Sequence, residues 1–199
     1  WGIGLIASTE GKKSRKVVEY GINALKAVWH RGAVDADGKT GDGAGVHLEI
    51  PSDFFVEKIE LTGHKHDGSD ICVGMIFLPR NNFEEQENSR TLVESELTKS
   101  NFSIYGWRQV PVNPKVLGEK ENSTRPEITQ VLFKHNDKNL TGKKLERKIY
   151  ESRRKIEKES IKNSIKDFYI CSLSSKSIIY KGMFLAESIS DFYMDLKDE

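Results

Sequence analysis

The sequence predicts an α+β fold, because strand-like and helical segments follow one another without strict alternation and a hairpin signal indicates antiparallel pairing. Residues 71–78 form a continuous apolar run of strand length, whereas residues 82–100 show helical periodicity. Residues 168–173 and 177–180 are short apolar runs separated by Ser-Ser-Lys, which is typical of a hairpin. At 199 residues the chain suits one domain with a real core, so we expect a single domain over residues 1–199.

The first part of the chain predicts a strand, a helix, a loop and a second strand. Ser14 caps the helix, whose apolar face carries Val18, Ile22, Leu25 and Trp29 at helical spacing. The following segment is rich in Gly and Asp, which favour tight turns. We expect a buried strand over residues 2–7, the helix over 15–29 and the turn-rich loop over 33–43. A half-buried strand over 46–50 and a short helix opened by Pro51 follow.

The remaining chain predicts a strand, an extended loop, another strand and a long helix before the hairpin. Residues 111–126 hold three of the five prolines, which indicates an extended loop between strands at 102–110 and 128–133. Thr141 caps a charged helix with Leu145, Ile149 and Ile156 along its apolar stripe. A helix-like segment begins at Ala186.

Composition excludes several classes of partner. The formal net charge is only +1 although 31% of residues are charged, which argues against nucleic acid or an anionic membrane. No apolar run is long enough to span a bilayer, and no signal peptide is expected.

Cys72 and Cys171 each lie in an apolar run, so we expect two reduced, buried thiols rather than a disulfide or metal pair. The expected compartment is the cytoplasm.

Three motifs fail as independent sites. Gly38-Lys39-Thr40 ends like a phosphate-binding loop, but the required earlier glycine is replaced by Ala33. The dinucleotide-like spacing that begins at Gly2 has no preceding strand. His64 and His66 lie in a polar stretch that favours a solvated loop, so no metal site is expected.

Taken in order, a series of short motifs resembles the class II glutamine amidotransferases, specifically the amidotransferase domain of the glutamate synthase family. Each motif is weakly specific alone, but their shared order and spacing cover the whole chain. The motifs are Gly2-x-Gly4, His30-Arg31-Gly32-Ala33, Thr40-Gly41-Asp42-Gly43-Ala44-Gly45, Gly106-Trp107-Arg108, Ser152-Arg153-Arg154-Lys155 and Asp167-Phe168-Tyr169-Ile170-Cys171.

The resemblance implies the four-layer αββα sandwich of N-terminal nucleophile hydrolases, incomplete here at the C-terminus. In that family residue 1 is a cysteine whose thiol attacks the side-chain amide of glutamine, with its own α-amine as base. Ammonia leaves, and hydrolysis of the thioester gives glutamate. This chain has Trp1 instead, whose indole nitrogen is a donor only, so we expect no glutaminase activity from the chain as written.

The resemblance also implies roles for other residues near the motifs. Trp1 occupies the nucleophile position, and Arg31 lines the site near it or, alternatively, binds loop carbonyls around Asp42. His30 is expected to be a packed structural histidine. We expect Gly41, Gly43 and Gly45 to serve turns and close packing. The residues expected to contact substrate or support the site are Gly2, His30, Gly32, Asp42 and Gly43.

By the same resemblance, ammonia passes to a synthase domain that acts on 2-oxoglutarate. FMN and an iron–sulfur cluster belong to that remainder of the parent protein, and this chain carries no cofactor. Reductant comes from an NAD(P)H-oxidising small subunit or from ferredoxin. Two alternatives stay open: a non-catalytic binding or regulatory module that keeps the fold, and a Trp1 that reflects a truncated or misread start, one base change from cysteine.

Overall fold

The computed structural model describes residues 2–197, which divide into two compact units. The chain passes between the units four times, so neither is a contiguous stretch of sequence. Unit 1 comprises Trp1–Leu48, Val110–Arg125 and Ile179–Glu199, and unit 2 comprises Glu49–Gln109 and Pro126–Ile178.

Unit 2 is built on a four-stranded antiparallel sheet in the order β3-β4-β2-β5. Its strands are β2 (Cys72–Leu78), β3 (Phe102–Gln109), β4 (Glu127–His135) and β5 (Tyr169–Ser174). In the central strand β2, Gly74 lies opposite Val131 on one side and Leu173 on the other. A Cβ at Gly74 would lie 2.6 Å from the Leu173 side chain and 2.7 Å from that of Val131, so neighbouring side chains fill the space above this glycine.

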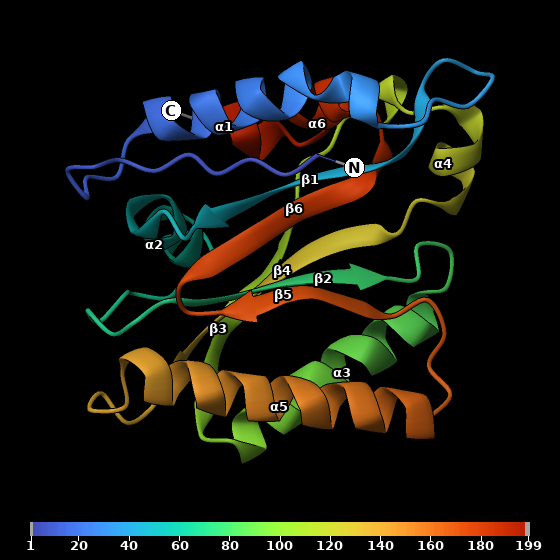
Figure 1. The fold of residues 1–199 in the computed structure, drawn as a ribbon. Helices are drawn as coiled ribbons and strands as arrows, with labels where there is room; N and C mark the ends of the chain where they lie inside the picture. Colours follow the sequence, from blue (N-terminus) through green and yellow to red (C-terminus); the bar gives the residue numbers. More distant parts are fainter. Residues whose placement is uncertain (1, 198–199) are drawn as a thin grey trace. The chain divides into compact units, whose positions relative to one another are not determined.

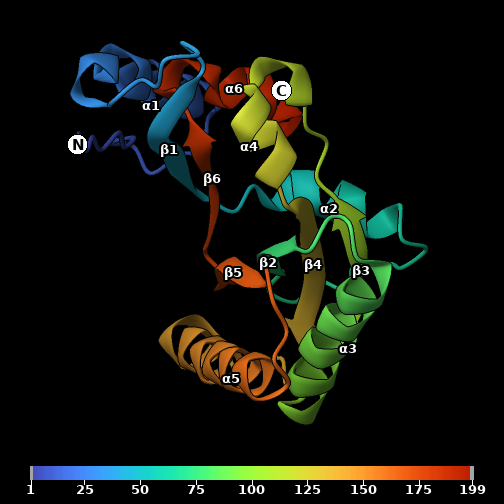
Figure 2. The same ribbon diagram turned by 90° about the vertical axis from the view of Figure 1, so that its right-hand side faces the viewer.

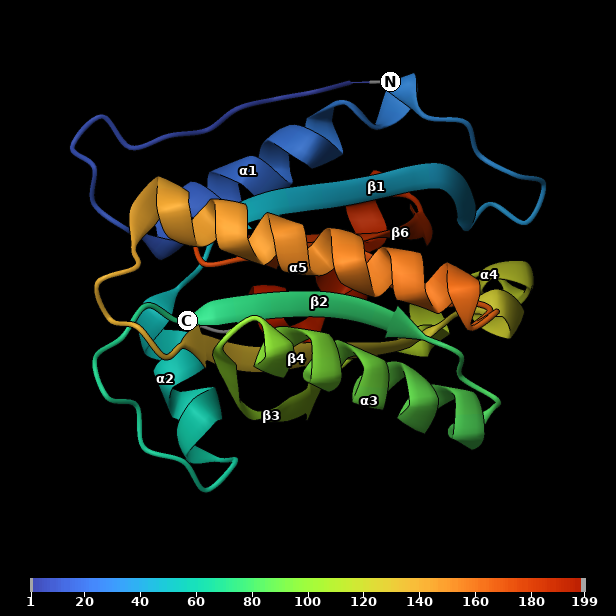
Figure 3. The same cartoon turned by 90° about the horizontal axis from the view of Figure 1, so that it is seen from below.

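Helices α3 (Phe83–Lys99) and α5 (Gly142–Lys162) cover one face of this sheet (Figures 1 and 3). The Asn82 side chain caps α3 by accepting a hydrogen bond from Glu85 N. The apolar stripe of α5 packs into the core as predicted. Buried residues of this core include Ile76, Val93, Leu97, Phe102, Val131, Phe133, Leu145, Ile149 and Ile156. The shorter α2 (Ser52–Glu60) contacts β3.

Unit 1 contains a two-stranded sheet of β1 (Thr40–Glu49) and β6 (Ser177–Phe184). Helices α1 (Arg15–Ala27) and α6 (Ile189–Phe192) lie on the same side of this sheet (Figures 1 and 2). An aromatic cluster fills the interior, and the Tyr193 hydroxyl donates to Lys181 O at 2.8 Å. The cluster comprises Tyr180, Phe184, Phe192 and Tyr193. The other elements are α4 (Glu119–Thr124) and the 3-10 turns Trp29–Arg31, Pro114–Val116, Ala186–Ser188 and Met194–Lys197.

Several predictions are confirmed. The fold is α+β, with antiparallel sheets and packed helices, as the sequence predicts. The Ser14 side chain accepts a hydrogen bond from Lys16 N at the start of α1. Cys72 and Cys171 are buried in β2 and β5 and form no disulfide, and burial raises the pKa of Cys72.

The predicted strand over residues 2–7 is wrong. The segment has no regular secondary structure, and Ile3 and Leu5 are 99% and 89% exposed. A strand requires a hydrogen-bonded neighbour and a surface that buries its apolar face. Among residues 2–197 the sheet of unit 1 has only β1 and β6, and neither pairs with this segment.

The predicted hairpin is also wrong, because its two strands pair with different neighbours. β5 pairs with β2 in unit 2, whereas β6 pairs with β1 in unit 1. The connection between them is instead held by Glu146 of α5, which accepts hydrogen bonds from Ser174 Oγ and from Ser175 N and Oγ. Hydrogen bonds to the Glu146 side chain therefore hold this turn in place of cross-strand bonds.

Two further boundaries differ from the prediction. Residues 111–126 include α4 and a 3-10 turn rather than an extended loop throughout. β1 starts at Thr40, within the glycine-rich segment predicted as turns. Gly41, Gly43 and Gly45 lie beside Phe184, Gly182 and Lys181 respectively, an antiparallel register. Close packing is confirmed for these glycines, but they lie in a strand.

Candidate functional site

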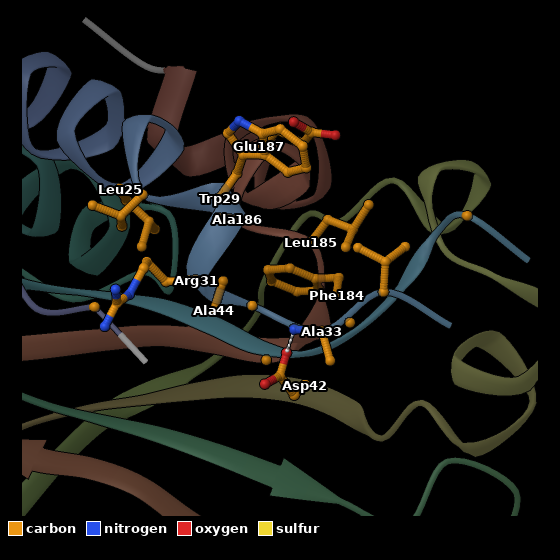
Figure 4. A pocket seen from close by; sticks show the side chains of 17 residues that line it. Leu25, Trp29, Arg31, Ala33, Asp42, Ala44, Phe184, Leu185, Ala186 and Glu187 are labelled. Carbon is orange, nitrogen blue, oxygen red and sulfur yellow. Dashed lines mark hydrogen bonds between the residues drawn. The ribbon is translucent and has the colours of Figure 1, made fainter. Parts of the chain in front are cut away.

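A pocket of about 290 Å³ lies within unit 1 (Figure 4). Its walls come from Gly2, the C-terminal end of α1, the 3-10 turn Trp29–Arg31, the loop that precedes β1, β1 itself and the segment that follows β6. Its volume is close to the lower end of the range for small-molecule sites, about 300–1,000 Å³. Unit 1 thus offers a concave site of suitable size for an amino acid.

The structure brings together five of the seven residues predicted for the site. Lining the pocket are Gly2, Arg31, Gly32, Asp42 and Gly43. His30, which precedes Arg31, is exposed and does not line the pocket. His30 is therefore not the packed histidine that we expected. Trp1, at the predicted nucleophile position, lies outside the described residues.

Asp42 organises the turn that follows Arg31. Its Oδ1 accepts a hydrogen bond from Ala33 N at 2.6 Å (Figure 4). A Cβ at Gly32 would lie 3.3 Å from the same oxygen, so there is little room for a side chain there. The sequence Arg31-Gly32-Ala33 is therefore held against β1 by the Asp42 carboxylate, which fixes the backbone beside Arg31.

Gly2 brings the start of the chain to the end of α1. A Cβ on Gly2 would lie 3.1 Å from Val28 Cγ2, so the backbone packs closely against the Val28 side chain. Val28 also lines the pocket, as do Leu25 and Trp29. The chain start therefore reaches the same pocket as Arg31, although the two are far apart in sequence.

The charged side chains among the described lining residues are Arg31, Asp42 and Glu187 (Figure 4). A cation and two carboxylates around one small cavity suit a ligand that carries both charges, such as a free amino acid. Sequence reasoning missed Glu187, and also Trp29 and Phe184 as lining residues. No local signal points to Glu187, because it reaches the pocket only through the pairing of β6 with β1.

The loop before β1 forms another part of the pocket wall, through Val34 and Gly38. Asp37 organises this loop: its Oδ1 accepts from Lys39 N at 2.9 Å and Thr40 N at 2.8 Å, and its Oδ2 accepts from Thr40 Oγ1 at 2.6 Å. These hydrogen bonds, that from the Thr40 hydroxyl foremost, lower the pKa of Asp37 to about 2. Gly38 has φ +69°, which suits a glycine at the tip of the turn.

Across residues 2–197, no group of three or more His, Cys, Asp or Glu side chains is arranged to hold a metal ion. His64 and His66 instead make local hydrogen bonds, to Thr62 Oγ1 and Ser69 O respectively. Within the same residues, no helix has both the length and the apolar character needed to cross a membrane.

Comparison with known proteins identifies the family. The class-II glutamine amidotransferase family matches residues 1–199. The chain is 54% identical over 198 residues to the glutamate synthase (NADPH) large chain of Azospirillum brasilense, covering 100% of this chain and 13% of that protein. It is 37% identical to a ferredoxin-dependent glutamate synthase of Pyropia yezoensis, covering 98% of this chain and 13% of the relative.

A third relative is the ferredoxin-dependent glutamate synthase 1, chloroplastic/mitochondrial, of Arabidopsis thaliana, 38% identical with 100% of this chain and 12% of the relative covered. The chain thus spans only about an eighth of the length of these curated relatives. Because the family match covers the whole sequence, the chain belongs to the class-II glutamine amidotransferases.

Proposed function

We propose that this chain forms part of the glutamine site of a glutamate synthase, and that both units belong to one amidotransferase domain. In its relatives the domain would hydrolyse glutamine and supply ammonia to a synthase domain acting on 2-oxoglutarate. The observation that carries the proposal is the pocket of unit 1, which gathers Gly2, Arg31, Gly32 and Asp42 around about 290 Å³. Glutamine is small enough and carries both charges, in keeping with the charged groups of the wall.

Arg31 and Asp42 have separate roles in this proposal. The Arg31 guanidinium contributes a positive charge to the wall, where it attracts the substrate carboxylate. Asp42 acts through the backbone, because its hydrogen bond from Ala33 N fixes the turn that carries Arg31. Arg31 is therefore the residue that we propose to touch substrate, and Asp42 positions it.

The identity of residue 1 decides whether bound glutamine can be hydrolysed. The family mechanism uses a thiol at this position and the adjacent α-amine, whose pKa of about 7.7–8.0 allows it to accept a proton near neutral pH. Trp1 provides no nucleophilic atom. We therefore propose that the chain as written releases no ammonia from glutamine. The second candidate function, favoured by Trp1, is a non-catalytic module that retains the fold and binds a ligand or partner.

The decisive experiment measures ammonia release from glutamine by the longer protein that carries this chain, with Trp1, Trp1→Cys and Trp1→Ala. Activity only in Trp1→Cys supports the glutaminase site. Trp1→Ala is the matched control, since it removes the bulk of the indole without adding a thiol. Activity with Trp1 would refute the nucleophile argument. No activity in any variant, with glutamine binding also absent by calorimetry, supports the non-catalytic module.

A pair of neighbouring substitutions tests the pocket itself. In the Trp1→Cys protein, Arg31→Ala should weaken glutamine binding by about tenfold or more, because a charge-assisted hydrogen bond contributes about 1.5–3 kcal/mol. His30→Ala should leave binding unchanged, because His30 is exposed and does not line the pocket. Equal effects of the two substitutions in a titration would contradict the proposed role of Arg31.

The cofactors and partners implied by the resemblance belong outside the described residues. An iron–sulfur cluster is held by four cysteine thiolates, and this chain has two cysteines, both buried. The described residues therefore do not fit the cluster, and we propose that it and FMN lie in the remainder of the parent protein. The relatives are named for NADPH or ferredoxin, which we propose as alternative sources of reductant. We propose the cytoplasm as the compartment, because neither of these cysteines forms a disulfide.

A further inference from the structure

Helix α5 concentrates positive charge within unit 2. Its 21 residues include nine Lys and Arg but only four Glu, whereas the whole chain has a formal net charge of +1. The helix lies beside α3 on one face of the sheet of unit 2 (Figure 3). It therefore carries a strongly basic segment in a chain that is close to neutral as a whole.

The buried stripe of α5 determines which side chains face away from the sheet. Residues three or four apart lie on one face of a helix, and the face with Leu145, Ile149 and Ile156 is buried. The opposite face, the outer stripe, follows the same spacing, and every one of its residues is exposed. The outer stripe consists of Lys143, Arg147, Tyr150, Arg154, Lys158 and Ile161.

The arginines of the outer stripe have acidic neighbours on the same helix, but these neighbours do not bury their charge. Arg147 Nε lies 3.1 Å from Glu151 Oε1, and the Arg147 side chain is still 82% exposed. Arg154 pairs with Glu157, which also accepts a hydrogen bond from Arg153 Nε. Exposed pairs of this kind contribute little to stability, so exchanging them for a partner's carboxylates costs little.

The lysines of the outer stripe have no acidic partner within residues 2–197. Neither Lys143 nor Lys158 forms a salt bridge there. The two lysines lie about 22 Å apart along the helix axis, because an α-helix rises about 1.5 Å per residue. A partner that pairs with both lysines must therefore present acidic side chains along a similar length.

The motif Ser152-Arg153-Arg154-Lys155 divides between the two faces of α5. Ser152 is buried, and Arg153 Nη2 donates to Ile170 O at 2.8 Å, which fastens α5 to β5. Arg154 and Lys155 are exposed, and within the described part of the chain neither bonds to another helix or strand. The fold of unit 2 thus accounts for the first half of the motif and leaves the second half without a role.

Two large apolar side chains interrupt the charges of the outer stripe. Tyr150 and Ile161 are 61% and 79% exposed. Protein interfaces are enriched in Tyr and Arg, and their cores bury apolar groups. Nucleic acid and anionic bilayers instead reward a uniform positive surface, and the net charge of +1 gives them little attraction. The outer stripe therefore suits a protein surface that offers carboxylates to the arginines and apolar groups to Tyr150 and Ile161.

We propose that the outer stripe of α5 docks onto an acidic face of the remainder of the parent protein. The chain covers only 13% of the length of its curated relatives. A surface tethered to the same polypeptide has an effective concentration of about millimolar, which suits a contact built from exposed charges. The inference rests on the proposed function only in assigning the chain to a longer glutamate synthase, and it depends on neither the pocket nor residue 1.

The test is zero-length cross-linking of the full protein that carries this chain, with a carbodiimide that joins lysine amines to carboxylates in contact with them. Mass spectrometry should find Lys143 and Lys158 joined to Asp or Glu outside residues 1–199. The yield should fall at least threefold between about 0.1 M and about 1 M salt, because the Debye length falls from about 10 Å to about 3 Å. Cross-links confined to carboxylates within residues 1–199 would overturn the proposal. The cross-links form without glutamine, so they can be found even where the glutaminase assay fails.

Two controls identify the occupant of the outer stripe. Isotope-labelled and unlabelled protein are mixed before cross-linking, and cross-links within one copy support the proposal. Cross-links that join labelled to unlabelled peptides would overturn it in favour of self-association. Binding to phosphatidylserine vesicles or duplex DNA that Arg147→Gln/Arg154→Gln abolishes would also overturn it, because the partner would then not be a protein surface.

A pair of double substitutions tests the charges themselves. Arg147→Gln/Arg154→Gln should lower the cross-linking yield of the two lysines at least threefold, because the partner loses two of its four cations. The matched control is Lys65→Gln/Lys166→Gln, which removes the same charge from exposed residues of unit 2 outside α5. None of these side chains belongs to the core, so both variants should keep the circular dichroism of wild type. Equal yields from the two variants would overturn the role of the outer stripe.

Discussion

The two units achieve close packing by opposite means. Unit 2 fills the space between its sheet and helices with large apolar side chains, such as Phe133 of β4 and Ile149 of α5. Unit 1 brings backbones together at glycines, because Gly41 and Gly45 of β1 lie against the backbone or Cβ of β6 and its neighbours. Gly41 and Gly43 of β1 also line the pocket, where the lack of a side chain leaves room for it. The comparison indicates that the core of unit 2 contributes mainly to stability, whereas glycines in unit 1 replace larger side chains beside the pocket.

Among the substitutions proposed here, the largest loss of stability should come from one in the core of unit 2. Ile149 is fully buried, so Ile149→Ala should lower the free energy of unfolding by about 2–5 kcal/mol through lost burial and the resulting cavity. Its neighbour Tyr150 is 61% exposed, and Tyr150→Ala should change the free energy by no more than about 0.5 kcal/mol. Urea denaturation of both variants measures the difference. Similar losses for the two would contradict the assignment of the buried face of α5.

The next effect tests the glycine packing of unit 1. A Cβ at Gly45 would lie 2.9 Å from Lys181 Cβ and 3.1 Å from Tyr180 O. Gly45→Ala should therefore destabilise the protein by about 1–3 kcal/mol, because the backbones must separate.

The matched control, Gly21→Ala, should change the stability in the opposite direction. Gly21 lies within α1, and a Cβ there would meet nothing within 4 Å. Gly21→Ala should stabilise the protein by about 0.5–1 kcal/mol through helix propensity. Thermal melting of both variants decides the matter, and a Gly45→Ala variant as stable as wild type would mean that the strands of unit 1 adjust easily.

The smallest effect is pH-dependent and belongs to unit 2. Asp67 accepts hydrogen bonds from Lys134 Nζ at 2.7 Å and from Ser69, and these hold its pKa well below the ordinary value. A lowered pKa means that the contribution of Asp67 is complete above about pH 4 and is lost as the pH falls below that value. Asp67→Asn should flatten this acid limb in a series of melting curves. Asp70→Asn, on the same exposed loop, should leave the limb as steep as in wild type.

Local patterns predicted the helices well. The stripe of α5 and the cap at Ser14 were readable because residues two to four apart at a helix start or along a helix face are neighbours whatever the rest of the chain does. The predicted cap at Thr141 makes no side-chain hydrogen bond to the start of α5. The strand at 71–78 was equally clear, since an apolar run of this length suits a strand and is too short for a typical helix.

Strand pairing was not readable in the same way. The segments at 168–173 and 177–180 looked like a hairpin, yet β5 and β6 pair with β2 and β1 respectively. Residues 2–7 looked like a buried strand, yet Ile3 is exposed. In each case the local pattern is compatible with a strand, but a strand exists only with a partner, and the choice of partner depends on residues far away in the sequence.

The sequence by itself determined the fold class, the main helices, the two buried thiols and the family. These depend on periodicity, capping and motif order, which are properties of neighbouring residues or of their order along the sequence. Only the tertiary structure placed Gly2, Arg31, Asp42 and Glu187 around one pocket, and only it joined Glu146 to Ser174. Those contacts arise where segments separated by tens of residues pack together, so their geometry depends on the whole unit rather than on any stretch of the chain.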